Sequence, residues 1–176
     1  MCRSWFAGRK FAGWLPIVLW ASVVDAQTCM VLSPPTIAAD GTASLDLSLY
    51  SARGSEPAAV QWTFQYPSAS IQTLTVDDGP VLTSAGKTAM CFGDASSFNC
   101  LAVGNNSKAI GNGIIAKLLA VLAPGATTAA IVIKSPLAAS TAGYLIPVIS
   151  KVIPGPGANA PSDCRPQLHR RDPVGK

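Results

Sequence analysis

The stretch Ala59-Val60-Gln61-Trp62-Thr63-Phe64-Gln65-Tyr66-Pro67 alternates strictly between two kinds of residue. Apolar side chains occupy the even positions from 60 to 66, and uncharged polar side chains occupy positions 61, 63 and 65. A period of two is typical of a β-strand with one buried and one exposed face. We therefore predict a strand that buries Trp62 and ends at Pro67, which has no backbone N–H for a sheet ladder.

The polar side of this strand, Gln61, Thr63 and Gln65, is the surface that we predict to bind a partner, because it is an uncharged outward row beside an aromatic core row. Trp62 and Tyr66 offer an alternative, since aromatic rings can stack on sugars. Their shared parity with the neighbouring apolar residues favours packing in the core instead.

The first 26 residues resemble a secretory signal peptide. Three basic residues within the first ten precede an apolar run from 11 to 24, and Val24-Asp25-Ala26 offers small or slender residues for cleavage after Ala26. The alternative is an uncleaved membrane anchor, but the run is shorter than the ~20 residues that a spanning helix needs. We expect a secreted or cell-surface protein with no membrane span after cleavage.

The remaining 150 of the 176 residues have a length that fits one domain. The segment removed carries three cations and one acid, so the formal net charge falls from +4 to +2. Four of the remaining cations lie beyond residue 160, and the body has no basic surface of the kind that nucleic acids require. Small, β-branched and turn-forming residues dominate, which favours an all-β domain.

Four cysteines remain after cleavage, and four cysteines allow three pairings. Cys91 and Cys100 flank a turn-rich segment between two strand-like runs, so we predict a disulfide across a hairpin. Cys29 and Cys164 then pair by elimination. An even set of cysteines agrees with export to an oxidising compartment.

Alternating or apolar runs bounded by turn residues predict about nine strands in one β-sandwich. The expected strands are residues 30–33, 42–51, 59–66, 71–76, 87–92, 98–103, 114–122, 127–134 and 144–152. The run 114–122 also fits a helical stripe, but the glycine-rich turn before it and the Pro-Gly after it favour a strand. The last two runs are apolar on both faces, as expected for central strands. Residues 154–176, rich in Pro and Gly at their start, are expected to form a flexible tail.

The order of these runs resembles the cohesin and cellulose-binding-module group of β-sandwiches. The resemblance covers roughly residues 29–152 and rests on four motifs: Gly41-Thr42 leading into an alternating strand, the aromatic strand ending in Tyr66-Pro67-Ser68, the strand 113–122, and Gly143-Tyr144-Leu145-Ile146-Pro147-Val148. It implies a single jelly-roll, immunoglobulin-like sandwich over residues 27–153. It also implies an exported module that binds a dockerin or a polysaccharide. Disulfides are not typical of cohesins, so this chain departs from the pattern there.

The sequence offers little for catalysis or metal binding. The single histidine, His169, lies in the tail, and the acids lie mostly at expected turns. Asp77-Asp78-Gly79 is the best calcium candidate, but Ca²⁺ needs six or more oxygens and a simple turn is the better interpretation. We expect no cofactor, no metal and no enzymatic activity.

Two functional hypotheses follow. The first is an exported, non-catalytic module that binds a polysaccharide or a dockerin-like protein through a sheet face. The alternative is a structural or self-assembling subunit of a cell-surface assembly, which the apolar late strands and the low net charge favour.

Overall fold

The structure is a computed structural model that describes residues 28–153 and Cys164. Eleven β-strands and one short helix follow one another in these residues. Their bounds are β1 Thr28–Leu32, β2 Thr36–Ile37, β3 Thr42–Tyr50, β4 Ala59–Gln65, β5 Ile71–Asp78, α1 Pro80–Ala85, β6 Thr88–Gly93, β7 Ser97–Val103, β8 Gly113–Leu122, β9 Val132–Ala139, β10 Leu145–Ile146 and β11 Val148–Val152. The predicted signal peptide, residues 1–26, and all of the predicted tail except Cys164 lie outside the described residues.

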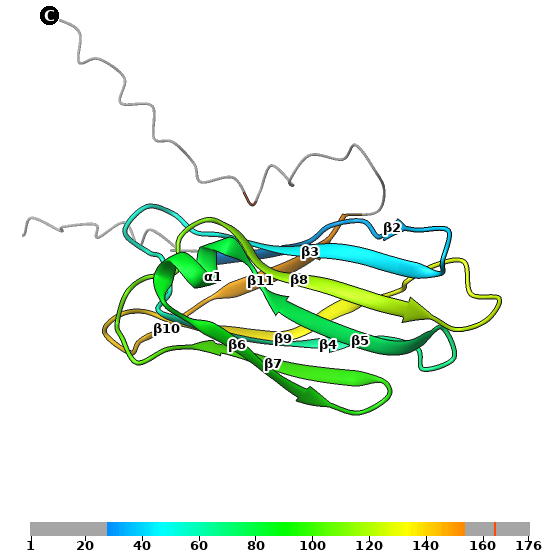
Figure 1. The fold of residues 1–176 in the computed structure, drawn as a ribbon. Helices are drawn as coiled ribbons and strands as arrows, with labels where there is room; N and C mark the ends of the chain where they lie inside the picture. Colours follow the sequence, from blue (N-terminus) through cyan, green and yellow to red (C-terminus); the bar gives the residue numbers. More distant parts are fainter. Residues whose placement is uncertain (1–27, 154–163, 165–176) are drawn as a thin grey trace, which may run out of the picture.

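The strands form two sheets that lie face to face (Figure 1). One sheet has the order β11-β1-β3-β8-β5, with β2 added beside β3, and the other has the order β10-β9-β4-β7-β6. The predicted all-β sandwich is therefore confirmed. Two of the strands have only two residues each, and the nine longer ones match the predicted number.

The core between the sheets follows from the alternating patterns. Leu45, Leu47 and Leu49 of β3 are buried, and so are Trp62 and Phe64 of β4. The intervening residues of both strands point away from the core. Burying these large side chains on the inner faces gives the main free energy that holds the two sheets together.

The ambiguous run from residue 114 is a strand, β8, as predicted. It is central in its sheet, because it pairs with β3 on one side and β5 on the other. The expected turn at Asp77-Asp78-Gly79-Pro80 is wrong. β5 continues through Asp78, and helix α1 begins directly afterwards, with Pro80 in its first turn and Gly86 in the left-handed conformation after its end.

The strand predicted at 127–134 is also shifted, since β9 covers Val132–Ala139. Ser135 has a positive φ of 47°, and the β4–β9 register shifts between Gln61 and Thr63, so β9 passes Pro136 by means of a bulge. The predicted strand stopped at Lys134, so it missed the part of β9 that contains Pro136.

The run predicted as one strand at 144–152 is divided at Pro147. Its first part, β10, is an edge strand beside β9, whereas its second part, β11, belongs to the opposite sheet and pairs in parallel with β1. The Thr28 N–H donates to the Pro147 carbonyl at 3.0 Å. Neither part is a central strand, so that expectation is corrected.

Candidate binding face

The register of the β10-β9-β4-β7-β6 sheet brings the outward side chains of four strands into rows. Gln61 on β4 is opposite Leu101 on β7 and Leu137 on β9, and Leu101 is opposite Met90 on the edge strand β6. The next row places Lys134, Thr63, Asn99 and Phe92 side by side. We call the outward surface of these rows, together with Val132, Gln65 and Ser97, the binding face.

The binding face is more apolar than the sequence analysis indicated. Met90 is 60% exposed, Phe92 66% and Leu137 49%, and Val132 is also exposed. Exposed single apolar residues are common, but several on one sheet face mark a surface that can bury area against a partner. The polar residues Gln61, Thr63 and Gln65 therefore occupy the central strand of a mixed face rather than a purely polar one.

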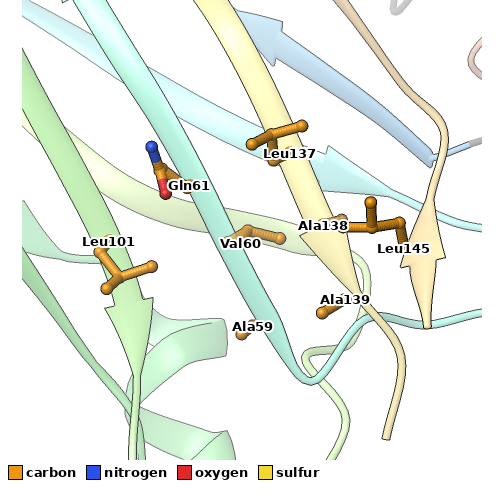
Figure 2. Close-up of a pocket in the computed structure, with 8 residues that line it drawn as sticks. All are labelled: Ala59, Val60, Gln61, Leu101, Leu137, Ala138, Ala139 and Leu145. Carbon is orange, nitrogen blue, oxygen red and sulfur yellow. The ribbon is translucent and has the colours of Figure 1, made fainter. Parts of the chain in front are cut away.

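A shallow groove of about 170 Å³ lies at one end of the binding face. Figure 2 shows its lining, in which Gln61, Leu101 and Leu137 extend from three neighbouring strands and Leu145 comes from the edge strand β10. Leu145 is 77% exposed, so it extends the apolar surface onto the edge strand of the sheet. The groove could receive one apolar side chain of a partner.

Lys134 is the one charged side chain among the eleven residues of the binding face. It is exposed and lies opposite Thr63 across the β4–β9 ladder. A single cation without a neighbouring acid on the same face favours a partner that presents a carboxylate at that point.

The turn between β6 and β7 is held by one carboxylate. Asp94 accepts hydrogen bonds from the Ser96 N–H at 2.9 Å, the Ser96 hydroxyl at 3.1 Å and the Ser97 N–H at 2.9 Å. These bonds, chiefly those from Ser96, hold the pKa of Asp94 below its ordinary value. The Tyr66 hydroxyl donates to the Asp94 carbonyl at 3.2 Å, and burial raises the pKa of Tyr66.

Disulfides join Cys91 to Cys100 and Cys29 to Cys164. The first joins directly opposite residues of β6 and β7, and these strands carry Met90, Phe92 and Leu101 of the binding face. The bridge lies on the core side of the same two strands. It therefore ties the edge strand of the binding face to its neighbour.

The other candidates lie away from this face or in the core. Trp62 and Tyr66 are buried, so they do not form a surface platform for sugars. The Asp78 carboxylate accepts a hydrogen bond from the Ala89 N–H at 2.7 Å. Asp77 on β5 lies opposite Lys117 on β8, and both of these strands belong to the sheet that does not carry the binding face. Among residues 28–153 and Cys164, no three His, Cys, Asp or Glu side chains are grouped so that they could hold a metal ion.

Within the described part of the chain, no helix has both the length and the apolar character needed to cross a membrane. No protein-family model matches the chain, and no curated protein matches it significantly.

Solved structures do resemble it. The sixth cohesin of scaffoldin B from Acetivibrio cellulolyticus, in complex with a Cel5 dockerin, aligns with a TM-score of 0.61 at 10% identity, covering 72% of this chain and 97% of that one. The OlpC cohesin of Clostridium thermocellum, in complex with a dockerin, gives 0.60 at 15% identity, covering 73% and 93%. A non-cellulosomal cohesin from the archaeon Archaeoglobus fulgidus gives 0.54 at 11% identity, covering 73% and 92%. The chain therefore has the fold of a cohesin domain.

Proposed function

We propose that this chain is an exported, non-catalytic module that binds a partner protein through the binding face. The observation that carries the proposal is the outward apolar row around Gln61, in which Leu137 and Met90 are exposed and Leu101 is half-buried. Apolar side chains at the centre of a flat face, with amides and hydroxyls around them, have the composition of a protein interface.

The kind of partner that we propose is a dockerin-like protein. Two of the cohesins that share this fold were crystallised with dockerins. Their identity to this chain is 10% and 15%, so they support the fold, and the partner is inferred from the fold together with the exposed face. Lys134 adds a preference for a partner with an acidic residue opposite it.

A polysaccharide partner has less support than a protein partner. Sugar-binding faces use exposed aromatic rings, but Trp62 and Tyr66 are buried. Phe92 is the one aromatic side chain among the eleven residues of the binding face. A protein partner therefore fits the surface better than a glycan chain does.

Export is part of the proposal and rests on two features. The basic and apolar pattern of residues 1–26 resembles a signal peptide, and both disulfides favour an oxidising compartment. We therefore place the mature protein outside the cell or on its surface.

The test is a binding assay against purified dockerin modules and insoluble polysaccharides with matched charge variants. Met90→Glu/Leu137→Glu places two charges on the binding face, and Gln61→Lys/Thr63→Lys/Gln65→Lys changes its central strand. Leu119→Glu/Val121→Glu is the control, because these residues are exposed on the opposite sheet. We expect both face variants to bind at least about tenfold more weakly, which is about 1.4 kcal/mol, and the control to bind like wild type.

A dockerin or polysaccharide that binds all variants equally would contradict the binding face. Light scattering on the same samples tests the alternative of a self-assembling subunit. A dimer or larger assembly that Met90→Glu/Leu137→Glu dissociates would show that the face binds a second copy of the chain. A monomer at high concentration would argue against self-assembly.

A further inference from the structure

Strand β6 is one edge of the sheet that carries the binding face, and its outer side pairs with no other strand of the described residues. The other three edges of the described sheets carry features that discourage the addition of a strand. β10 has only two residues, β5 ends in Asp77 and Asp78, and β11 contains Lys151. β6, Thr88–Gly93, has six residues with no charge and no proline. It is therefore the edge that is most open to another strand.

Two observations show which backbone groups of β6 point outward. The Ala89 N–H donates to the Asp78 carboxylate at 2.7 Å, so it points away from β7. The Cα atoms of Cys91 and Cys100, which are directly opposite, are 4.1 Å apart. This is close to the ~4.5 Å of a pair that exchanges no hydrogen bonds. Because the direction alternates along a strand, the N–H and C=O groups of Ala89, Cys91 and Gly93 all point outward.

These outward groups are self-complementary. A second copy of β6 can lie antiparallel to the first with the two Cys91 residues opposite each other, so that each Cys91 N–H meets the Cys91 carbonyl of the other copy. Ala89 then lies opposite Gly93 of the second copy, and the Gly93 N–H meets the Ala89 carbonyl. The Ala89 N–H keeps its bond to Asp78. The outward donors and acceptors of one edge therefore match those of its own copy.

The same register brings two exposed apolar side chains together. Met90 of each copy lies opposite Phe92 of the other, in a pair without hydrogen bonds, where side chains come closest. Both residues are more than half exposed, so both have apolar area to bury. A methionine sulfur also packs favourably against an aromatic ring. We propose that β6 pairs edge to edge with a second copy of this chain, antiparallel and centred on Cys91.

This pairing goes beyond the proposed function, because the contact is the backbone edge of β6. It joins two five-stranded sheets into one continuous sheet. The two-fold axis of an antiparallel pair is perpendicular to the sheet, so the two binding faces point to the same side. Gln61 on β4 and Leu137 on β9 lie further inside each sheet and stay outside the contact. One dimer therefore presents two binding faces side by side, which favours a partner with two sites.

The first experiment measures the association and its location in the mature chain, residues 27–176, with both disulfides intact. We expect sedimentation equilibrium to give a monomer–dimer equilibrium with a Kd of about 10 µM to 1 mM, since the contact is small. Amide hydrogen exchange by NMR locates it. The amides of Cys91 and Gly93 should exchange about fivefold or more slowly when the dimer predominates. The amides of Met90 and Phe92 already face β7 and should not change.

The second experiment tests the register by exchanging charges. Met90→Lys and Phe92→Glu should each raise the dimer Kd at least about tenfold, because each places a charge against an apolar side chain of the other copy. The double variant Met90→Lys/Phe92→Glu places each new cation opposite a new carboxylate of the second copy. It should dimerise at least about threefold more tightly than either single variant. A parallel, in-register pair would instead place like charges opposite each other and give no such recovery.

Leu137→Glu is the matched control, because Leu137 is exposed on the binding face but lies away from β6. It should weaken binding of a dockerin-like partner and leave the dimer Kd unchanged, so this proposal and the proposed function can fail separately. A protein that stays monomeric at about 1 mM would overturn the pairing. So would a double variant no tighter than the single ones, unchanged exchange at Cys91 and Gly93, or a dimer that Leu137→Glu dissociates.

Discussion

Trp62 on β4 and Cys100 on β7 are direct cross-strand partners, and both are fully buried between the two sheets. Cys100 is also bonded to Cys91 on the next strand. The indole ring makes an edge-on contact with Phe64, with 6.0 Å between the ring centroids. Trp62 therefore lies where the aromatic strand, the disulfide hairpin and the opposite sheet meet.

Replacing Trp62 should separate the contribution of its volume from that of its polar atom. Its indole N–H is buried and has no hydrogen-bond partner among the described residues. Trp62→Phe removes this unsatisfied donor, so it should cost less than about 2 kcal/mol, whereas Trp62→Ala should cost about 3 to 5 kcal/mol. Urea unfolding followed by far-ultraviolet circular dichroism measures both. A Trp62→Phe cost that approached the Trp62→Ala cost would contradict this account.

Ser135 adopts a left-handed backbone conformation, which is unfavourable for any residue with a Cβ atom. Its φ is 47°, it is exposed, and it forms the bulge of β9 beside Pro136. Ser135→Gly should leave the free energy of unfolding unchanged or raise it by up to about 1 kcal/mol, because glycine adopts this φ freely. Ser135→Val should lower it by about 1 to 2 kcal/mol. Thermal unfolding of Ser135→Gly and Ser135→Val measures both effects. A valine variant as stable as wild type would mean that β9 rearranges.

Gly79 permits a close approach between the end of β5 and strand β8. Its N–H donates to the Ile115 carbonyl at 2.9 Å, and a Cβ at this position would overlap the backbone of Ile114 and Ile115. Gly79→Ala should destabilise the protein by about 2 kcal/mol or more. Gly111→Ala is the control, since its Cβ would come no closer than 4.0 Å to Val81. Denaturant unfolding of both should show a difference, and equal stabilities would be evidence against this packing.

Asp94 should make the β6–β7 turn sensitive to acid. Its hydrogen bonds lower the folded-state pKa below the ordinary value of 3.8, so the folded protein favours the carboxylate. This stabilisation is fully present above the unfolded-state pKa and is lost as the pH falls through the folded-state pKa. Carbon-13 NMR titration should give a pKa below 3.8 for this carboxyl group. Asp94→Asn should flatten the loss of stability between about pH 5 and pH 2, and a carboxyl that titrates at or above 3.8 would contradict the account.

The cysteine pairing can be read directly from the exported protein. We expect non-reducing peptide mapping to recover Cys91 with Cys100 and Cys29 with Cys164. The same experiment should show an N-terminus at Gln27, if the signal peptide is cleaved after Ala26. A Cys29–Cys91 or Cys29–Cys100 peptide, or four free thiols, would be incompatible with the fold and with an oxidising compartment.

The fold class could be predicted because alternation is a local property. The side chains of a strand point alternately to opposite faces, so residues 59–67 and 42–51 reveal a buried and an exposed side without any knowledge of their neighbours. Where local chemistry was ambiguous, the prediction was less accurate. Pro136 lies inside β9, where a bulge accommodates its missing N–H. Pro147 lies between β10 and β11, where the chain passes from one sheet to the other. Both arrangements depend on the tertiary structure.

The composition of the binding face required the tertiary structure. By itself the sequence determined a β-sandwich in which Gln61, Thr63 and Gln65 point away from the core, since the period of two separates them from Trp62. Only the register of the ladders decided that Leu137, Leu101 and Met90 lie beside Gln61, on strands up to 76 residues away in the chain. The physical reason is that cross-strand neighbours are selected by the packing of both sheets together, which no single stretch of sequence contains.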